Sequence, residues 1–264
     1  MRSFDFHRPR AVADAVALLR GNDGAKVLAG GQSLLPVMKL DLAQPSDLVS
    51  LAGIPGLKEI RADGNELVIG ALVTHDEVAA SPEVKRRIPA LAALAGGIGD
   101  AQVRNRGTLG GSLAHADPAA DYPAAVLALG ATIETDRRKI AADDYFTGLF
   151  STALAPDEII TGVHFPVPER AGYAKFAHPA SKYALVGVFV AKTAGGVRAA
   201  VTGAGSKAFR VPALESALAA SFAPDTVPVG VVAPGDLRSG GDASPEYLAH
   251  LVTVMARRAV QAAQ

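Results

Sequence analysis

Residues 29–36 read AGGQSLLP, and residues 107–112 read GTLGGS, followed by LAHADPAAD up to residue 121. Each stretch is predicted to join a strand to a helix. The paired glycines remove side chains, so exposed backbone N–H groups become the recognition surface. Such groups offer partial positive charge without bulk, which suits a diphosphate. Two such loops about 80 residues apart predict one extended, phosphate-bearing cofactor held from two sides.

The composition limits the class of protein. The chain has 264 residues, 49% of them apolar, and 26 basic residues balance 26 acidic ones. This balance disfavours a nucleic-acid binder or a polybasic membrane-surface protein. The sequence contains no long apolar run and no stretch of signal-peptide type at its start, so a cytoplasmic protein without a transmembrane segment is expected.

The sequence contains no cysteine. This excludes disulfides, cysteine nucleophiles and cysteine-ligated iron–sulfur clusters on the chain itself. The six histidines show no metal-ligand spacing, and no G-x-S-x-G or similar nucleophile pattern occurs. Cofactor loops without acid–base machinery are typical of electron transfer, in which the cofactor carries the chemistry.

Hydrophobic periodicity and turn signals predict a β-α-β unit in residues 1–52. A hairpin is expected around Asp63-Gly64-Asn65. Helices then open at a Thr74–Glu77 capping box and at Ser81-Pro82. The elements expected after these are a buried helix over 89–96, a helix over 119–129, a strand over 131–135, a short helix starting at 144–146 and a strand over 159–165.

The Pro-rich stretch 166–170 predicts a hinge and a domain boundary. Beyond it, three antiparallel strands at 173–176, 184–192 and 197–202 precede helices at 212–220 and 245–263. A sheet followed by helices indicates a small α+β domain. The expected domains are residues 1–167, with subdomains of about 1–52 and 53–167, and residues 168–264.

A second glycine pattern competes for the dinucleotide site. Residues 203–208 read GAGSKA, which fits G-x-G-x-x-A. No parallel strand-and-helix series follows it, and the nearest suitable acidic residue, Asp225, lies in a Pro-rich loop. The sequence therefore favours the two loops at 29–36 and 107–112.

Several polar residues near the second loop allow two interpretations. Asp117 and Asp121 are either helix caps or acceptors for ribityl or ribose hydroxyls, and the cap is favoured for Asp117 only. Tyr183 is either a core residue or faces a planar ring. Arg104 and Arg106 are solvated charges, phosphate neighbours or partner contacts.

The two loops, together with Asp117-Pro118-Ala119-Ala120-Asp121, resemble the FAD loops of the medium, flavin-carrying subunit of molybdenum hydroxylases. This family includes xanthine dehydrogenase and aerobic carbon monoxide dehydrogenase. The similarity extends over nearly the whole chain, including the opening FDFHRP at residues 4–9. It implies an α+β fold: an FAD-binding domain of the p-cresol methylhydroxylase type with two α/β subdomains, then a small α+β domain with a three-stranded antiparallel sheet.

The resemblance also implies which residues contact FAD. The two loops would hold the diphosphate and ribityl chain, and Leu109 would approach the isoalloxazine. Asp121 would bond the flavin nucleotide, and Tyr183 would cover one ring face. The implied cofactor-binding set is Ala29, Gly30, Gly31, Gln32, Ser33, Leu34, Leu35, Thr108, Leu109, Gly110, Gly111, Ser112, Asp121, Ile160, Lys175 and Tyr183.

In the family that the sequence resembles, two [2Fe-2S] clusters lie on a small subunit and the molybdenum cofactor on a large one. Electrons would pass from molybdenum through the clusters to FAD, then to an external acceptor, in a dimer of heterotrimers. The alternatives are a self-sufficient FAD oxidoreductase of the same fold and a non-catalytic nucleotide-binding module. A bulky residue at Gly110 or Gly111 is expected to abolish flavin binding in a folded chain.

Overall fold

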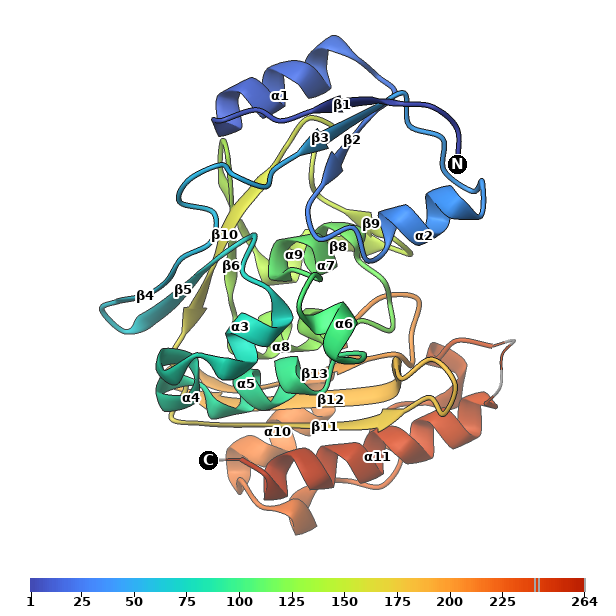
Figure 1. Ribbon diagram of the computed structural model, residues 1–264. Coiled ribbons are helices and arrows are strands. Elements are labelled where there is room, and N and C mark those ends of the chain that lie inside the picture. Colours follow the sequence, from blue (N-terminus) through green and yellow to red (C-terminus); the bar gives the residue numbers. More distant parts are fainter. Residues whose placement is uncertain (240, 242, 264) are drawn as a thin grey trace.

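The computed structural model describes residues 1–239, 241 and 243–263. A small lobe containing β1 to β3 lies at one end, a central sheet with several helices follows, and a C-terminal sheet lies at the other end (Figure 1). Buried apolar side chains form three clusters, one in each of these regions. The central cluster also includes Phe189 and Ala200 of the C-terminal sheet, so the central and C-terminal regions share a core.

The N-terminal lobe is a three-stranded parallel sheet with two helices. Strand β3 lies between β1 and β2 and pairs in parallel with both. Ala15, Val16 and Leu19 form the buried face of α1. The predicted β-α-β pattern is confirmed, with β1 (Asp5–His7), α1 (Val12–Gly21), β2 (Ala25–Leu28), α2 (Leu34–Lys39) and β3 (Asp47–Ser50).

The central region contains a five-stranded antiparallel sheet in the order β4-β5-β10-β6-β7. Its strands are β4 (Ile60–Asp63), β5 (Glu66–Gly70), β6 (Thr132–Thr135), β7 (Lys139–Ala141) and β10 (Ile160–Pro166), and β8 (Phe146–Gly148) pairs separately with β9 (Ser151–Thr152). The helices are α3 (His75–Ala80), α4 (Pro82–Arg87), α5 (Pro89–Gly96), α6 (Ala101–Arg104), α7 (Leu109–His115), α8 (Tyr122–Leu129) and α9 (Ala142–Tyr145).

Local capping explains where the helices of this region begin. At α3, Glu77 N–H donates to Thr74 Oγ1 (3.3 Å) and Thr74 N–H donates to Glu77 Oε2 (2.9 Å), which confirms the capping box. Ser81 accepts from Val84 N–H in the same way at α4. No helix in the described part of the chain is long and apolar enough to cross a membrane.

Three local predictions for the central region are wrong. The second glycine loop follows helix α6 rather than a strand, although Thr108 forms a single bridge with Thr74. Helix α8 begins at Tyr122 instead of 119, because a turn closed by Asp117 holds the preceding residues. The short helix near residue 144 ends at Tyr145 rather than beginning there.

The C-terminal sheet has four antiparallel strands, not three. Phe209–Arg210 adds a fourth strand by pairing with Ala200 and Val201, and a two-residue strand is too short to produce a periodic signal. The elements are β11 (Arg170–Ala177), β12 (Ala184–Thr193), β13 (Gly196–Thr202), β14 (Phe209–Arg210), α10 (Pro212–Ala220), α11 (Pro245–Gln261) and the 3-10 turns Pro224–Thr226 and Pro234–Asp236.

This sheet is covered on both faces. Helices α5 and α8 lie on one side of it and α10 and α11 on the other (Figure 1). Residues 184–191 of β12 are accordingly buried without alternation, as expected for a strand packed on two sides. The sheet therefore packs directly against α8 and the segment that leads into it.

Candidate functional site

The two glycine loops come together in the folded chain. A Cβ atom placed on Gly30 would lie 1.9 Å from the carbonyl oxygen of Arg106 and 3.0 Å from Gly107 Cα. Only glycine tolerates this approach, because a real Cβ would overlap the backbone of the other loop. The predicted meeting of two loops distant in sequence is therefore observed, and it occurs at the junction of the N-terminal lobe and the central region.

The first loop carries unpaired backbone donors. The N–H groups of residues 29–33 donate no hydrogen bond to any group in the described part of the chain. Gly31 has φ +75°, so the backbone turns through the left-handed region at this point. Successive N–H groups around such a turn form a concavity that binds anions. This loop thus fits the phosphate role that its sequence predicts.

The second loop does not offer its N–H groups in the same way. Leu109 N–H donates to Val73 O (3.0 Å), Gly110 N–H to Ala71 O (2.9 Å) and Gly111 N–H to Thr108 Oγ1 (3.1 Å). The prediction that these N–H groups form an exposed recognition surface is therefore wrong. They hold α7 in place beside the first loop.

Gly110 is required for packing. It is buried, and a Cβ atom on it would lie 2.6 Å from Ala71 Cβ and 2.8 Å from Ala71 O. A bulky side chain would displace this backbone, so a Gly110 variant is expected to lose stability as well as flavin binding. Gly111 is less confined, since its Cβ would meet only Thr108 Oγ1 (2.8 Å) and Ala29 Cβ (3.7 Å).

Asp121 belongs to a buried polar cluster between α8 and β11. Its Oδ1 accepts hydrogen bonds from Tyr173 OH (2.6 Å) and from Lys175 Nζ (2.9 Å). Lys175 Nζ also donates to Gly97 O (2.8 Å). Burial raises the pKa of Asp121, whereas the Lys175 ammonium and the Tyr173 hydroxyl act in the opposite direction. Asp121 Oδ1 is therefore satisfied by two donors of the protein.

Tyr173 is the member of this cluster that sequence reasoning missed. It lies two residues before Lys175 on β11, so both side chains leave the same face of the strand. Period-two alternation around Lys175 would have identified it. Asp121 makes no side-chain bond to the start of α8, so the helix-cap interpretation of Asp121 is not supported.

Asp117 and Tyr183 flank the cluster. Asp117 Oδ1 accepts from Ala119 N–H (2.8 Å), so Asp117 caps the turn before α8 rather than the helix itself. Tyr183 lies one residue before β12, not on a strand, and is 46% exposed. Partial burial and the carboxylates of Asp117 and Asp121 raise the pKa of Tyr183.

Ile160 and Leu109 are both buried. Leu109 is fully buried in the central core, and Ile160, the first residue of β10, is 4% exposed. The predicted approach of the Leu109 side chain to a flavin ring would therefore require the core to rearrange.

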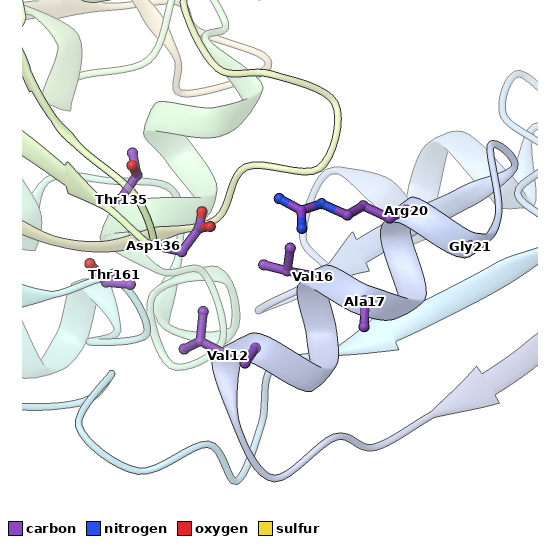
Figure 2. A pocket seen from close by; sticks show the side chains of 9 residues that line it. Val12, Val16, Ala17, Arg20, Gly21, Thr135, Asp136 and Thr161 are labelled. Carbon is purple, nitrogen blue, oxygen red and sulfur yellow. The ribbon is translucent and has the colours of Figure 1, made fainter.

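Two shallow cavities of about 820 Å³ lie elsewhere, around α1. One opens between α1 and the ends of β6 and β10, where the Arg20 side chain extends toward Asp136 (Figure 2). Neither cavity is lined by a residue of the predicted FAD set. The candidate site is thus defined by converging loops and the buried cluster, not by these cavities.

The comparisons with known proteins agree with this geometry. A glycine loop with unpaired N–H groups, held against a second glycine loop, fits a protein that binds a phosphate-bearing cofactor. A family model described as the FAD binding domain in molybdopterin dehydrogenase matches residues 2–168. The chain belongs to this family, and it is an FAD-binding subunit of the molybdenum hydroxylase type of oxidoreductase.

Individual relatives cover most or all of the chain. The nicotine 6-hydroxylase medium subunit of Paenarthrobacter nicotinovorans is 44% identical, over 80% of this chain and 78% of its own length. The carbon monoxide dehydrogenase medium chain of Afipia carboxidovorans is 36% identical, over 99% and 97%. A carbon monoxide dehydrogenase structure from Hydrogenophaga pseudoflava superposes with a TM-score of 0.90 at 36% identity, over 99% and 97%. The mixed α/β architecture is therefore that of these medium chains.

Proposed function

We propose that this chain transfers electrons within a molybdenum hydroxylase complex, taking them from [2Fe-2S] clusters on a partner subunit and passing them to an external acceptor. The observation that carries the proposal is a cysteine-free sequence in which the two glycine loops converge and in which no sequence pattern of a nucleophile paired with a base occurs. FAD supplies redox chemistry that can link a one-electron donor to a two-electron acceptor. The chain's own residues would bind, orient and shield it.

The roles of the site residues follow from the donors, acceptors and exposed surface that each of them leaves unused within the protein. The unpaired N–H groups of residues 29–33 would bind the diphosphate, and α7 would support them from behind. Asp121 Oδ2 would accept a hydroxyl of the ribityl chain, because Oδ1 already has two donors. The half-exposed ring of Tyr183 would cover a planar face of the flavin. The rest of the proposed set is Leu34, Leu35, Thr108, Leu109, Gly110, Gly111, Ser112, Ile160 and Lys175.

The finer organisation belongs to the same proposal. We propose a small iron–sulfur subunit and a large molybdopterin subunit as partners, in a cytoplasmic dimer of heterotrimers. The support is that named relatives are medium chains of multi-subunit enzymes. The proposed division of this chain at residues 167 and 168 follows the Pro-rich stretch before β11.

The test uses the complex purified with its partner chains. Acid release is expected to yield FAD at one per chain, alongside iron. After reduction with dithionite, clusters should reoxidise through an added artificial acceptor in the complete complex but far more slowly in the flavin-depleted complex. Equal reoxidation rates with and without flavin would overturn the electron-transfer role.

A further inference from the structure

Arg106 is an unpaired cation at the contact between the two loops. Its backbone oxygen is the atom that would meet a Cβ on Gly30, so it adjoins the first loop directly. Its side chain is exposed and makes no ion pair, hydrogen bond or ring contact in the described part of the chain. Its neighbours differ, because Arg104 donates to Ile98 O and Gly99 O, and Asn105 donates to Ala101 O.

Unpaired arginines are uncommon in this structure. Carboxylates pair with the guanidinium groups of most of the others, and several of the remainder donate to backbone carbonyls. Among the described arginines, Arg106 shares its lack of partners only with Arg10 and Arg258. Arg10 precedes α1, and Arg258 lies in the last turn of α11. Of these three, Arg106 is the one whose backbone contacts the glycine loop.

The site needs a cation that the rest of the cluster does not supply. A diphosphate diester carries about two negative charges, and backbone N–H groups provide only partial positive charge. Lys175 is already paired with Asp121 (2.9 Å) and with Gly97 O. Asp117 and Asp121 add negative charge nearby. Arg106 carries a long, unpaired guanidinium on a backbone that contacts Gly30 of the first loop, and such a group suits a bidentate contact with phosphate oxygens.

We infer that Arg106 is the charged partner of the cofactor diphosphate, and that it makes this chain prefer a flavin dinucleotide to a flavin without phosphate. The inference rests on the proposed FAD site and extends it to a residue outside both glycine motifs. Arg106 acts on binding and selectivity, so its effect should depend on the phosphate groups of the ligand and on ionic strength.

The test compares FAD with riboflavin, which shares the isoalloxazine and ribityl groups but lacks phosphate. Flavin-free full chain is titrated by fluorescence quenching at low and moderate salt. Arg106→Gln is expected to weaken FAD binding by about tenfold or more and to flatten its salt dependence, with riboflavin affinity unchanged. The FAD affinity of Arg106→Lys should lie between those of the wild type and Arg106→Gln, since lysine keeps the charge but cannot bind phosphate through two parallel N–H groups.

Arg258→Gln is the matched control, because it removes the same charge from an exposed, unpaired arginine on α11. It should leave both affinities at the wild-type value. The inference is overturned if Arg106→Gln leaves FAD affinity unchanged, or weakens FAD and riboflavin equally. Wild-type protein that binds neither ligand would instead refute the proposed FAD function, and with it this role of Arg106.

Discussion

At the scale of single residues, Gly30 occupies the tightest backbone contact of the candidate site. A methyl group there would lie 1.9 Å from Arg106 O, a backbone atom directly before the other loop that cannot move aside as the end of a flexible side chain could. The contact between the two loops therefore requires glycine at this position, independently of any ligand. A substitution of Gly30 tests both the loop contact and the proposed binding of FAD.

We expect Gly30→Ala to lower the free energy of unfolding by about 1–3 kcal/mol, because the loops must separate to admit the methyl group. FAD content per chain should fall sharply, since the separated loop no longer presents its N–H groups together. Absorbance of released flavin and urea unfolding would measure the two effects. Gly21→Ala is the control, because a Cβ at Gly21 meets nothing within 4 Å. Wild-type FAD content in Gly30→Ala would contradict the proposed contact.

At the scale of elements, β11 fixes the position of the segment before α8. Tyr173 and Lys175 both reach Asp121 from this strand, and Thr202 of β13 donates to Pro118 O and Ala120 O. The C-terminal sheet thus positions an acidic residue of the proposed site through side-chain bonds. The cluster is deeply buried, with 4% exposure for Asp121 and 11% for Lys175, so its charges are poorly screened.

Lys175→Met is expected to destabilise the protein by about 3–5 kcal/mol, because it leaves the Asp121 carboxylate buried without its counter-charge. Adding Asp121→Asn should recover part of this loss, since the amide is neutral and still accepts from Tyr173. Urea unfolding of both single variants and the double variant gives the coupling energy. Lys192→Met is the control: its partner Glu169 is 54% exposed, so a change within about 0.5 kcal/mol is expected. A coupling energy near zero would contradict the view that Lys175 compensates the buried charge of Asp121.

At the scale of the whole molecule, the pH dependence of stability should reflect His75. This residue is 5% exposed, lies against Tyr122 with ring centroids 5.3 Å apart, and has an unpaired Nδ1. Burial lowers the pKa of His75 to about 4 from 6.5, and the charge of Arg104 acts in the same direction. The folded protein therefore holds His75 neutral in the mildly acidic range.

The direction in which stability changes with pH follows from how many protons the folded and unfolded chains bind. Below pH 6.5 the unfolded chain protonates His75 while the folded chain does not, so stability falls as the pH drops from about 6.5 to about 4. The loss amounts to about 3 kcal/mol and then levels off. Hydrogen bonds from Arg138 and other donors lower the pKa of Glu158 to about 2, so Glu158 affects the stability only below its usual pKa of 4.5.

Urea midpoints measured from pH 7 to pH 4 would test this expectation. His75→Gln should flatten the dependence between pH 6.5 and 4.5, and His250→Gln, at an exposed position, should leave it at the wild-type slope. An unchanged slope in His75→Gln would assign the dependence to other groups.

Sequence patterns were sufficient to predict many of the helices, strands and loops of this protein, because the signals for these elements are local. Periodicity and capping residues located α1, α3 and α11, and the glycine stretches identified the two loops that meet in the fold. The fourth strand at Phe209–Arg210 escaped detection because two residues show no periodicity. The exposure of the second loop was mispredicted because Ala71 and Val73, distant in sequence, take up its N–H groups.

The sequence by itself determined most of the elements, the cofactor class and the absence of cysteine ligands, since these depend on residue type and short spacing. Tertiary structure alone decided which donors stay free and which acids are already satisfied. Residues 29–33 keep unpaired N–H groups, whereas Gly110 donates to Ala71 O, directly after β5, and Asp121 accepts from Tyr173 and Lys175 of β11. Hydrogen-bond satisfaction depends on contacts between distant segments, and only the folded chain specifies those contacts.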